Sequence, residues 1–345
     1  MFKKLKTALL ATLAIALPFT SSANSLPTDK VVIGFSHYTG WEPYAYIRDF
    51  GIMDQVNQEM GTNVEIRFYN TYDNSLAAYA GEAIHGVTMT NMDALVLSTS
   101  VSSKGLILGD TSHGNDAVVA YGYESCSDLE GQEVYLLTRS VSHFLLNQFL
   151  DTCGLTDMDV QVKNNADPLN LIVLMNDRIQ KKEPIAVVAW NPELQTILQN
   201  PKSKVLFDSS QIKGEIADWL FVRNDNTVTE KDKAALQEMW SRAMKIMTTR
   251  GAKQDEMIGF MAEFSGATKP QFIQQMKTTR FFTTAKASDK ERMDAGQEDI
   301  MNNVIEFVDS VDLLGEYSDS EEFGVKIGNG TVIGNDKDII LDLSK

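Results

Sequence analysis

The chain has 345 residues, a hydrophobic content of 43% and a formal net charge of -16. This length exceeds the roughly 250 to 300 residues at which a single core stops growing, so we expect two domain-sized units. Nucleic-acid binding needs a basic patch, and lysines and arginines do not cluster beyond the N-terminal segment, so we expect no nucleic-acid partner. The acidity weakly favours cationic or neutral small ligands, although it also serves solubility.

The first 23 residues have the pattern of a cleaved export signal. Lysines at positions 3, 4 and 6 precede an apolar run over residues 8–19, and the small residues Ser21 and Ala23 follow. The run is shorter than the roughly 18 to 20 apolar residues that span a bilayer. We therefore predict a signal peptide over residues 1–23 and a periplasmic mature chain, in preference to a membrane anchor or a buried helix.

Short apolar runs alternate with longer helical patterns, which is typical of an α/β protein with mainly parallel sheets. The expected strands cover residues 31–35, 64–68, 86–89, 106–108, 117–121, 133–137, 160–162, 185–189 and 220–222. The expected helices between them cover residues 42–50, 74–79, 92–98, 141–152, 168–181 and 192–198. Asp167 and Asn191 are good capping residues for the last two helices, since a proline follows each.

Beyond residue 230 the pattern changes. Apolar spacings of three and four predict helices only, over residues 231–250, 254–264, 270–276 and 289–314. The tail from residue 318 alternates around the turn dipeptide Asn329-Gly330, which predicts a hairpin. The sequence has no long linker, and we therefore expect two lobes that share crossings of the chain.

The two cysteines suit an oxidising compartment, where one disulfide persists. Cys126 precedes the expected strand 133–137, and Cys153 follows the expected helix 141–152. If this helix runs antiparallel to that strand, its end returns to the level where the strand begins. We therefore predict a Cys126–Cys153 bridge; the alternative is two small buried hydrophobic residues.

Enzyme and metal motifs are missing from the sequence. It has no phosphate-binding glycine loop, no zinc spacing of cysteine and histidine, and no G-x-S-x-G elbow. The four histidines, at positions 37, 85, 113 and 143, are too scattered for a metal site. Ser112-His113 and Ser142-His143 are sequence neighbours, which rarely face each other productively. We expect neither catalysis nor a metal or cofactor.

Polar and aromatic residues follow five of the expected strands, where open α/β sheets place their ligand crevice. The candidate ligand-binding residues at these strand ends are Trp41, Glu42, Asn91, Asp93, Asn115, Asp116, Ser140, His143 and Trp190. Structural interpretations exist for many of them: Asn91 and Asn191 as helix caps, Trp41 and Trp190 as core aromatics, and residues 110–116 as a solvated crossing loop. Their shared position at strand ends favours the functional interpretation.

Several runs in the chain are similar to segments of one family. They are Gly40-Trp41, LILGDTS (106–112), GNDAV (114–118), DLEG (128–131), SVSH (140–143), AWNP (189–192) and the segment 207–218, which contains Asp218. These runs resemble the periplasmic substrate-binding proteins of ABC importers of the nitrate/taurine type, and most of all the branch associated with urea carboxylase. The resemblance covers nearly all of the mature chain.

This resemblance implies a two-lobed periplasmic binding protein. Lobe 1 would comprise residues 30–112 and 206–317, lobe 2 residues 113–205, and residues 318–345 a hairpin extension. The lobes would close on a small solute by hinge motion and deliver it to an ABC permease in the inner membrane. We expect the protein to act as a monomer.

The resemblance leaves the ligand open. Carboxylates at Glu42, Asp93, Asp116 and Asp218 suit amide or guanidinium nitrogens, whereas Arg139 is the one obvious cation. Helix starts near Ser140 and Asn191 favour an oxygen acceptor. Such a mixed site suits urea, guanidine or a related amide. The alternatives are a sulfonate, nitrate or pyrimidine-like ligand, an exported enzyme on the same scaffold, or a sensory ligand-binding module.

Overall fold

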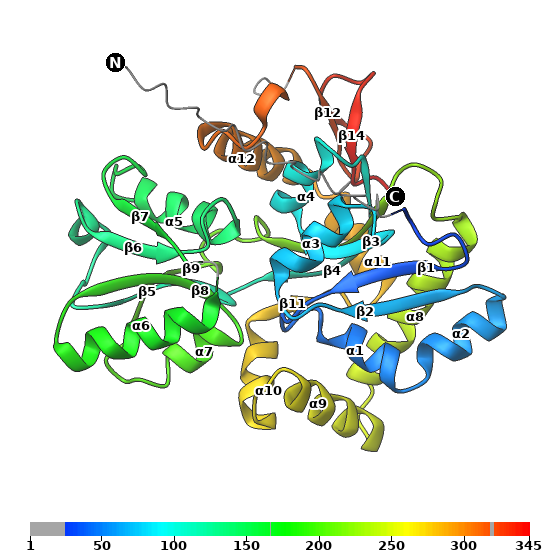
Figure 1. Cartoon of the computed structure of the whole chain (residues 1–345), viewed down its shortest axis with the longest axis horizontal. Coiled ribbons are helices and arrows are strands. Elements are labelled where there is room, and N and C mark those ends of the chain that lie inside the picture. The colour runs from blue at the N-terminus through cyan, green and yellow to red at the C-terminus, as the bar shows by residue number, and fades with distance from the viewer. Residues whose placement is uncertain (1–24, 166, 318–320) are drawn as a thin grey trace, which may run out of the picture.

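The structure is a computed structural model that describes residues 25–165, 167–317 and 321–345. The predicted signal peptide over residues 1–23 lies outside the described residues. Within the described ranges we find no helix with the length and apolar character that a bilayer crossing needs. The chain is built from two sheets with helices packed around them, which confirms the predicted α/β class (Figure 1).

Two sheets organise the chain. The strands of the larger sheet are β1 (Val31–Phe35), β2 (Val64–Phe68), β3 (Gly86–Thr90), β4 (Ser103–Ser112), β10 (Ala217–Arg223), β11 (Thr279–Phe281), β12 (Gly324–Lys326), β13 (Val332–Gly334) and β14 (Ile339–Asp342). The strands of the smaller sheet are β5 (Asp116–Tyr121), β6 (Glu133–Leu136), β7 (Gln161–Asn164), β8 (Ile185–Trp190) and β9 (Lys204–Asp208). The orders are β13-β12-β14-β4-β10-β3-β1-β2, with β11 paired to β4, and β7-β6-β8-β5-β9.

Helices cover both sheets (Figure 1). The helices around the larger sheet are α1 (Glu42–Asp49), α2 (Ile52–Met60), α3 (Tyr72–Ala80), α4 (Asn91–Ser98), α8 (Glu230–Thr248), α9 (Ala252–Phe264), α10 (Lys269–Lys277), α11 (Ala285–Arg292) and α12 (Gln297–Ser310). Those around the smaller sheet are α5 (Val141–Asp151), α6 (Pro168–Lys181) and α7 (Glu193–Ile197). We call the larger sheet with its helices the large lobe and the smaller sheet with its helices the small lobe.

The chain passes between the lobes twice. It leaves the large lobe between β4 and β5, over residues 113–115, and returns between β9 and β10, over residues 209–216. Strand β9 pairs with β5 of the smaller sheet through Asp208, so the small lobe extends beyond the predicted end at residue 205. The sequence analysis missed β9, in which the apolar run is only three residues long, from Val205 to Phe207.

Each sheet is mixed, whereas the sequence pattern predicted mainly parallel pairing. Strand β1 is parallel to both β2 and β3, but β10 is antiparallel to both β3 and β4. Strand β5 is likewise antiparallel to β8 and β9. The strands β10 and β5 each enter their sheet from the other lobe, so they run against their neighbours. Both strands are almost fully buried, and buried strands have the same apolar pattern in either direction.

Two helical predictions differ from the structure. Helix α2 was missed, and it begins directly after Gly51, which adopts a left-handed φ of 77° between α1 and α2. The predicted single helix over residues 289–314 is instead α11 and α12. They are separated at residues 293–296, where the Asp294 carboxylate accepts a hydrogen bond from the Gly296 N–H at 2.9 Å. A local side-chain bond of this kind competes with the helical one.

The C-terminal segment contains the predicted hairpin and one further strand. Strands β12 and β13 pair in antiparallel register around the turn. Strand β14 then runs parallel to β12 on one side and to β4 on the other. The segment is therefore an edge of the larger sheet rather than an appended extension.

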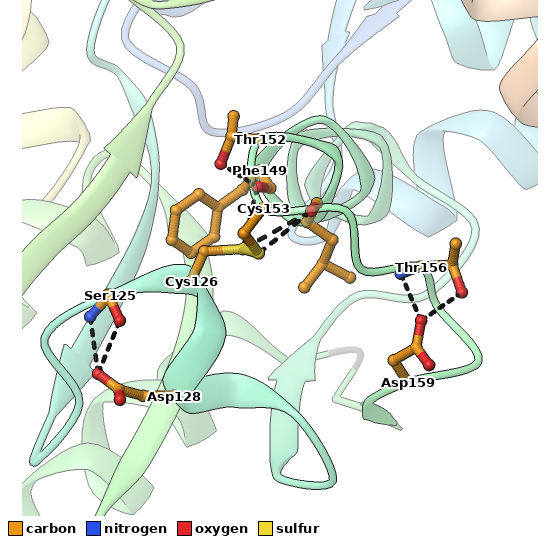
Figure 2. Close-up of a disulfide and its surroundings, with 9 residues drawn as sticks. Ser125, Cys126, Asp128, Phe149, Thr152, Cys153, Thr156 and Asp159 are labelled. Atoms are coloured by element: carbon orange, nitrogen blue, oxygen red, sulfur yellow. Dashed lines mark hydrogen bonds between the residues drawn. A yellow bond between two sulfur atoms is a disulfide. The ribbon is translucent and has the colours of Figure 1, made fainter.

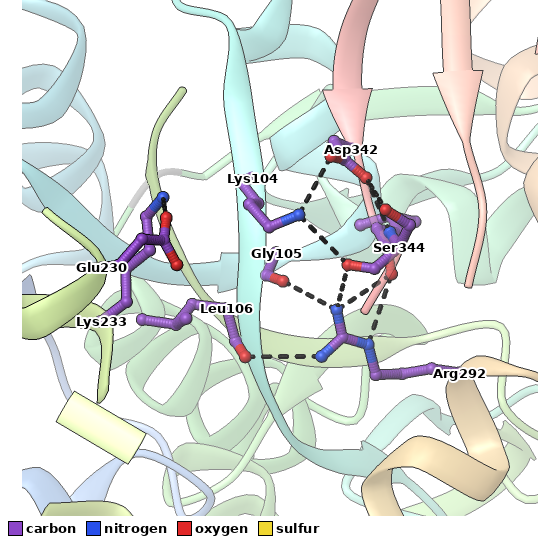
Figure 3. A network of polar contacts seen from close by, with 9 residues as sticks. Lys104, Gly105, Leu106, Glu230, Lys233, Arg292, Asp342 and Ser344 are labelled. Atoms are coloured by element: carbon purple, nitrogen blue, oxygen red, sulfur yellow. Dashed lines mark hydrogen bonds and ion pairs between the residues drawn. The ribbon is translucent and has the colours of Figure 1, made fainter. Parts of the chain in front are cut away.

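Arg292, the last residue of α11, fastens this edge to β4 (Figure 3). Its buried guanidinium donates hydrogen bonds to the carbonyl oxygens of Gly105 at 3.0 Å and Ser344 at 2.7 Å. Further bonds reach the carbonyl oxygens of Leu106 and Leu343. Gly105 and Leu106 lie on β4 between the residues that pair with β14 and those that pair with β11. Arg292 thus satisfies backbone groups that a neighbouring strand would otherwise pair.

The two cysteines form a disulfide in the small lobe (Figure 2). Cys126 begins a short 3-10 helix (Cys126–Leu129), and Cys153 follows α5, with a Cα–Cα distance of 6.1 Å. Asp128 fixes the start of the 3-10 helix because its carboxylate accepts a hydrogen bond from the Ser125 N–H at 2.9 Å. The bridge joins the end of α5 to the segment that leads into β6.

Replacing both cysteines should destabilise the protein. The bridge closes a sequence separation of 27 residues, and the loop-entropy model assigns roughly 3 to 4 kcal/mol to a loop of that size. We expect C126S/C153S to lower the unfolding free energy by about that amount in urea denaturation. An unchanged denaturation midpoint relative to the oxidised wild type would contradict this expectation.

Candidate functional site

A small cavity lies between the two lobes, at the ends of strands from both sheets. From the large lobe and the returning crossing, it is lined by His37, Tyr38, Trp41, Tyr72, Thr90, Ile216 and Asp218. From the small lobe, it is lined by Asp116, Leu137, Ser140, Val141 and Trp190. Its volume is about 30 Å³. Because one water needs roughly 10 to 15 Å³ by this measure, the cavity has room for about two.

The secondary structure explains how these side chains meet. Asp116 and Trp190 are register partners on β5 and β8, so they lie side by side at the end of the smaller sheet. Trp41 precedes α1, in the loop that follows β1. Ser140 is the N-cap of α5, where its hydroxyl accepts a hydrogen bond from the Ser142 N–H at 3.1 Å. The N-terminus of α5 therefore lies beside the cavity.

Three buried aspartates gather at the crossing between the lobes. Asp218 is the register partner of Asp110 across β10 and β4, and Asp116 begins β5 just beyond the crossing. The hydroxyl of Tyr38 donates to Asp110 at 3.1 Å, and that of Ser112 donates to Asp116 at 2.5 Å. A second oxygen of Asp110 and one of Asp218, both Oδ2, are buried without a hydrogen-bond partner among the described residues.

The absence of a side chain at Gly40 leaves room for the carboxylate of Asp110 at the crossing. A Cβ atom at Gly40 would overlap the carboxylate of Asp110, so glycine permits the close approach of the loop after β1. Among the described residues, however, these acidic groups do not form a set of three or more that could hold a metal ion.

Burial raises the pKa of each of these carboxyl groups. The pKa of Asp116 rises from 3.8 to about 6 because burial disfavours its charged form. Burial, together with repulsion between neighbouring carboxylates, raises the pKa values of Asp110 and Asp218 well above their ordinary range. Asp110 and Asp218 therefore hold at least one proton near neutral pH, and a bound cation would displace it.

His37 and Glu42 form a histidine–carboxylate pair at the wall of the cavity. The Nδ1 atom of His37 lies 2.9 Å from Oε1 of the fully buried Glu42. Burial raises the pKa of Glu42 to about 7, against the opposing effect of His37. Burial alone would lower the pKa of His37, but the hydrogen bond and charge of Glu42 raise it. Glu42 thus lies behind His37 and outside the cavity lining, whereas the sequence placed it among the ligand contacts.

Five of the ten predicted ligand-binding residues line the cavity: Trp41, Asp116, Ser140, Trp190 and Asp218. Asp93 and Asn91 support the lining from behind instead. The Asp93 carboxylate accepts hydrogen bonds from the hydroxyls of Tyr72 and Thr90, each at 2.7 Å. Asn91 bonds the backbone of Glu215 and Ala217, which holds the returning crossing in place.

Asn115 and His143 serve contacts between the lobes. The Asn115 amide accepts a hydrogen bond from Asn191 at 2.5 Å and donates one to the Thr279 hydroxyl at 3.1 Å. His143 lies 3.0 Å from Asp157, and its ring contacts Phe307 of α12 with centroids 5.4 Å apart. Neither side chain lines the cavity, because hydrogen bonds across the hinge hold Asn115 and packing on α12 holds His143.

His37, Tyr38, Tyr72, Thr90 and Asp110 were missing from the predicted set. His37, Tyr38, Thr90 and Asp110 lie in strand-end segments that the sequence had already drawn attention to. Tyr72 follows β2 at the same edge of the sheet, so the rule that placed Trp41 also applied to it. The sequence pattern did not distinguish Asp110 from the other residues of its segment, because its burial beside Asp218 depends on the pairing of β4 with β10.

Arg139 does not line the cavity. It precedes α5 with a left-handed φ of 61°, and its guanidinium donates a 3.5 Å hydrogen bond to the Val311 carbonyl oxygen. Among the described residues that line the cavity there is no lysine or arginine. The electrostatics of the cavity therefore favour a neutral or cationic ligand over an anion.

Neither Ser112 nor Ser142 is hydrogen-bonded to a histidine side chain among the described residues. Ser112 bonds Asp116 and lies 2.6 Å from the Ser209 hydroxyl, and the histidine that follows it makes a backbone bond to Thr278. Ser142 has no hydrogen-bond partner for its buried hydroxyl among the described residues. The disulfide occupies both cysteines.

Comparison with known proteins gives a result for the fold. No protein-family model matches the chain. No curated protein matches its sequence. Solved structures do match: the alkanesulfonate-binding protein SsuA from Xanthomonas axonopodis pv. citri, bound to MOPS, has a TM-score of 0.60 at 11% identity, over 81% of this chain and 94% of that one.

Two further structures share the architecture. The Candida albicans CA3427 gene product, described as having the generic periplasmic binding protein fold, has a TM-score of 0.62 at 12% identity, covering 86% of this chain and 93% of that one. The desulfurization enzyme DSZB has a TM-score of 0.56 at 12% identity, covering 82% and 93%. The chain therefore has the periplasmic binding protein fold, on which both binding proteins and an enzyme occur.

Asp116 should make stability depend on pH in a defined direction. Its folded-state pKa of about 6 exceeds the ordinary 3.8, so the native state binds more protons between these values and loses stability as pH rises through them. We expect the unfolding free energy of wild type relative to Asp116→Asn to fall by about 2 kcal/mol from about pH 4.5 to 8. A difference that stays constant across this range in urea titrations would refute the assignment.

Proposed function

We propose that this chain is the periplasmic solute-binding component of an ABC importer. It would capture urea, guanidine or a related small amide by closure of the two lobes and deliver it to the permease. The shared fold with SsuA and the export-signal pattern support the transport role. We further propose that the protein acts as a monomer in the periplasm, without cofactor or catalysis.

One observation carries the choice of ligand: the interlobe cavity is tiny, aromatic and acidic. Its volume of about 30 Å³ suits a solute of a few heavy atoms. Buried carboxylates at Asp116 and Asp218 would accept hydrogen bonds from amide or guanidinium nitrogens. The indole N–H of Trp41, which has no partner among the described residues, and the start of α5 would serve an oxygen acceptor such as that of urea.

The energetics suit hinge closure. Stacking of a flat cation on Trp41 or Trp190 contributes roughly 0.5 to 2 kcal/mol. A charge-assisted hydrogen bond to Asp116 or Asp218 contributes roughly 1.5 to 3 kcal/mol. Asp218 belongs to the large lobe and Asp116 to the small lobe. A solute that touches both favours the closed arrangement, which is the differential affinity that closure requires.

A sulfonate is the second candidate, because SsuA binds one in the solved structure. The start of α5 would favour an anion, but the aspartates beside it would repel it. An enzyme is the third candidate, as on the DSZB scaffold. It would need a nucleophile activated by a base; among the described residues, Ser112 bonds Asp116 and Ser209, and the buried Ser142 hydroxyl has no hydrogen-bond partner.

Calorimetry with four solutes separates these candidates. We expect urea or guanidine to bind and taurine and nitrate to give no heat, since the cavity offers carboxylates rather than cations. Product analysis of the same mixtures should show no turnover. Binding of taurine or nitrate, with no binding of the nitrogenous solutes, would eliminate the proposal.

Substitutions in the cavity should weaken binding while the fold persists. We expect Asp116→Ala to weaken binding of the solute identified in that panel by at least about tenfold and Trp41→Ala by about two- to thirtyfold, since they remove contacts worth roughly 1.5 to 3 and roughly 0.5 to 2 kcal/mol. Asp177→Ala, which removes an exposed carboxylate paired with Lys181 on α6, is the matched control. Wild-type affinity in both cavity variants, with far-UV circular dichroism unchanged, would show that the ligand binds elsewhere.

A further inference from the structure

A second, larger cavity adjoins the small one and extends it toward the rim of the lobes. Its volume is about 460 Å³, and it shares His37, Tyr72, Leu137 and Trp190 with the small cavity. We call it the vestibule. A ligand that filled only the inner cavity of about 30 Å³ would leave the whole vestibule to water.

The walls of the vestibule combine apolar surface with carboxylates. Phe264 of α9 and Leu169 of α6 continue the aromatic and aliphatic passage that begins at Trp190. Asp73 from the large lobe, with Asp167 and Glu193 from the small lobe, supplies the charge. Among the described residues lining the vestibule there is no lysine or arginine, and its histidine, His37, is paired with Glu42.

Glu193 is the carboxylate best placed to need a cation. It is the first residue of α7, directly after the Asn191-Pro192 peptide that follows Trp190. Its side chain lines the vestibule together with His37 and Asp167, and burial raises the pKa of its carboxyl group. A partly buried carboxylate near exposed Asp167, with no lysine or arginine among the described residues of the vestibule lining, is a favourable partner for a positive group.

The inner cavity has independent marks of a ligand site. Asp218 is 2% exposed and Trp41 is 5% exposed, and each has a buried polar atom without a partner among the described residues. Both residues line the inner cavity. The ligand head group therefore has its own donors and acceptors, separate from the carboxylates of the vestibule.

We infer that the ligand is an elongated organic cation, with a flat amide or guanidinium head in the inner cavity and an aliphatic amine in the vestibule beside Glu193. This inference rests on the proposed function and names its substrate class. The methylene chain lies along Tyr72, Trp190 and Phe264, and its terminal ammonium neutralises carboxylates of both lobes. The second charge therefore adds affinity to the closed state in particular.

Matched probes isolate the second charge. Butylguanidine and (4-aminobutyl)guanidine differ by one terminal amine, as do butylurea and (4-aminobutyl)urea, and guanidine and urea serve as bare heads. We expect the aminobutyl member of the pair with the preferred head to bind at least about tenfold more tightly in calorimetry. Equal affinity within both pairs, alongside binding of a bare head, would overturn this inference and leave the proposed function intact.

Variants locate the effect. We expect Glu193→Gln to reduce the affinity ratio between the aminobutyl and butyl probes by about tenfold. The control Asp177→Asn removes the same charge from the exposed face of α6, outside both cavity linings, and should preserve the ratio. An equal fall in the affinity ratio in both variants would show that long-range electrostatics, and not Glu193 in particular, attracts the ammonium group. That result would overturn the proposed site. Failure of every urea and guanidine probe to bind would overturn the proposed function as well.

Discussion

The arrangement of the two lobes depends on buried carboxylates at the point where the chain crosses between them. Asp110 lies near the end of the part of β4 that pairs with β10, Asp218 lies opposite it, and Asp116 is the first residue of β5 after the crossing. Ionised carboxylates this close together repel one another. The described residues that line the cavity include no lysine or arginine to offset the repulsion. Protons or a ligand cation must relieve that repulsion. The protonation of these carboxyl groups and the arrangement of the hinge are therefore coupled.

A network of uncharged side chains holds the lobes together beside this acidic centre. Gln275 of α10 donates to Oε1 of the Gln195 side chain at 2.8 Å and accepts from the Thr39 hydroxyl at 3.2 Å. Asn191 and Asn115 continue it across the hinge. One end of the network adjoins the loop that carries Trp41, and the other adjoins Trp190. Satisfied amides can hold a buried interface without adding charge to an already acidic site.

Local signals predicted most of the elements and half of the proposed contacts. Strands such as β1 and β2 were placed by short apolar runs, and α6 by Asp167, whose side chain accepts the Leu169 N–H at 3.0 Å. The strand-end rule selected Trp41 and Asp116 without any structure, because the ends of neighbouring strands meet at one edge. It also selected buried polar residues that contact the lining residues but do not line the cavity themselves. A buried polar residue has the same sequence signal in both cases.

The amino-acid sequence by itself determined the α/β class, the positions of most strands and helices, and the segments from which a site would come, because these follow from apolar periodicity and capping along a few residues. Tertiary structure alone decided which acids share the cavity, the antiparallel entry of β5 and β10, and the integration of β14 into the larger sheet. Those features arise from contacts between residues distant in the chain, such as Asp110 with Asp218 and Gly40 with Asp110. Burial, and with it the pKa of each carboxyl group, depends on the whole arrangement rather than on any single segment.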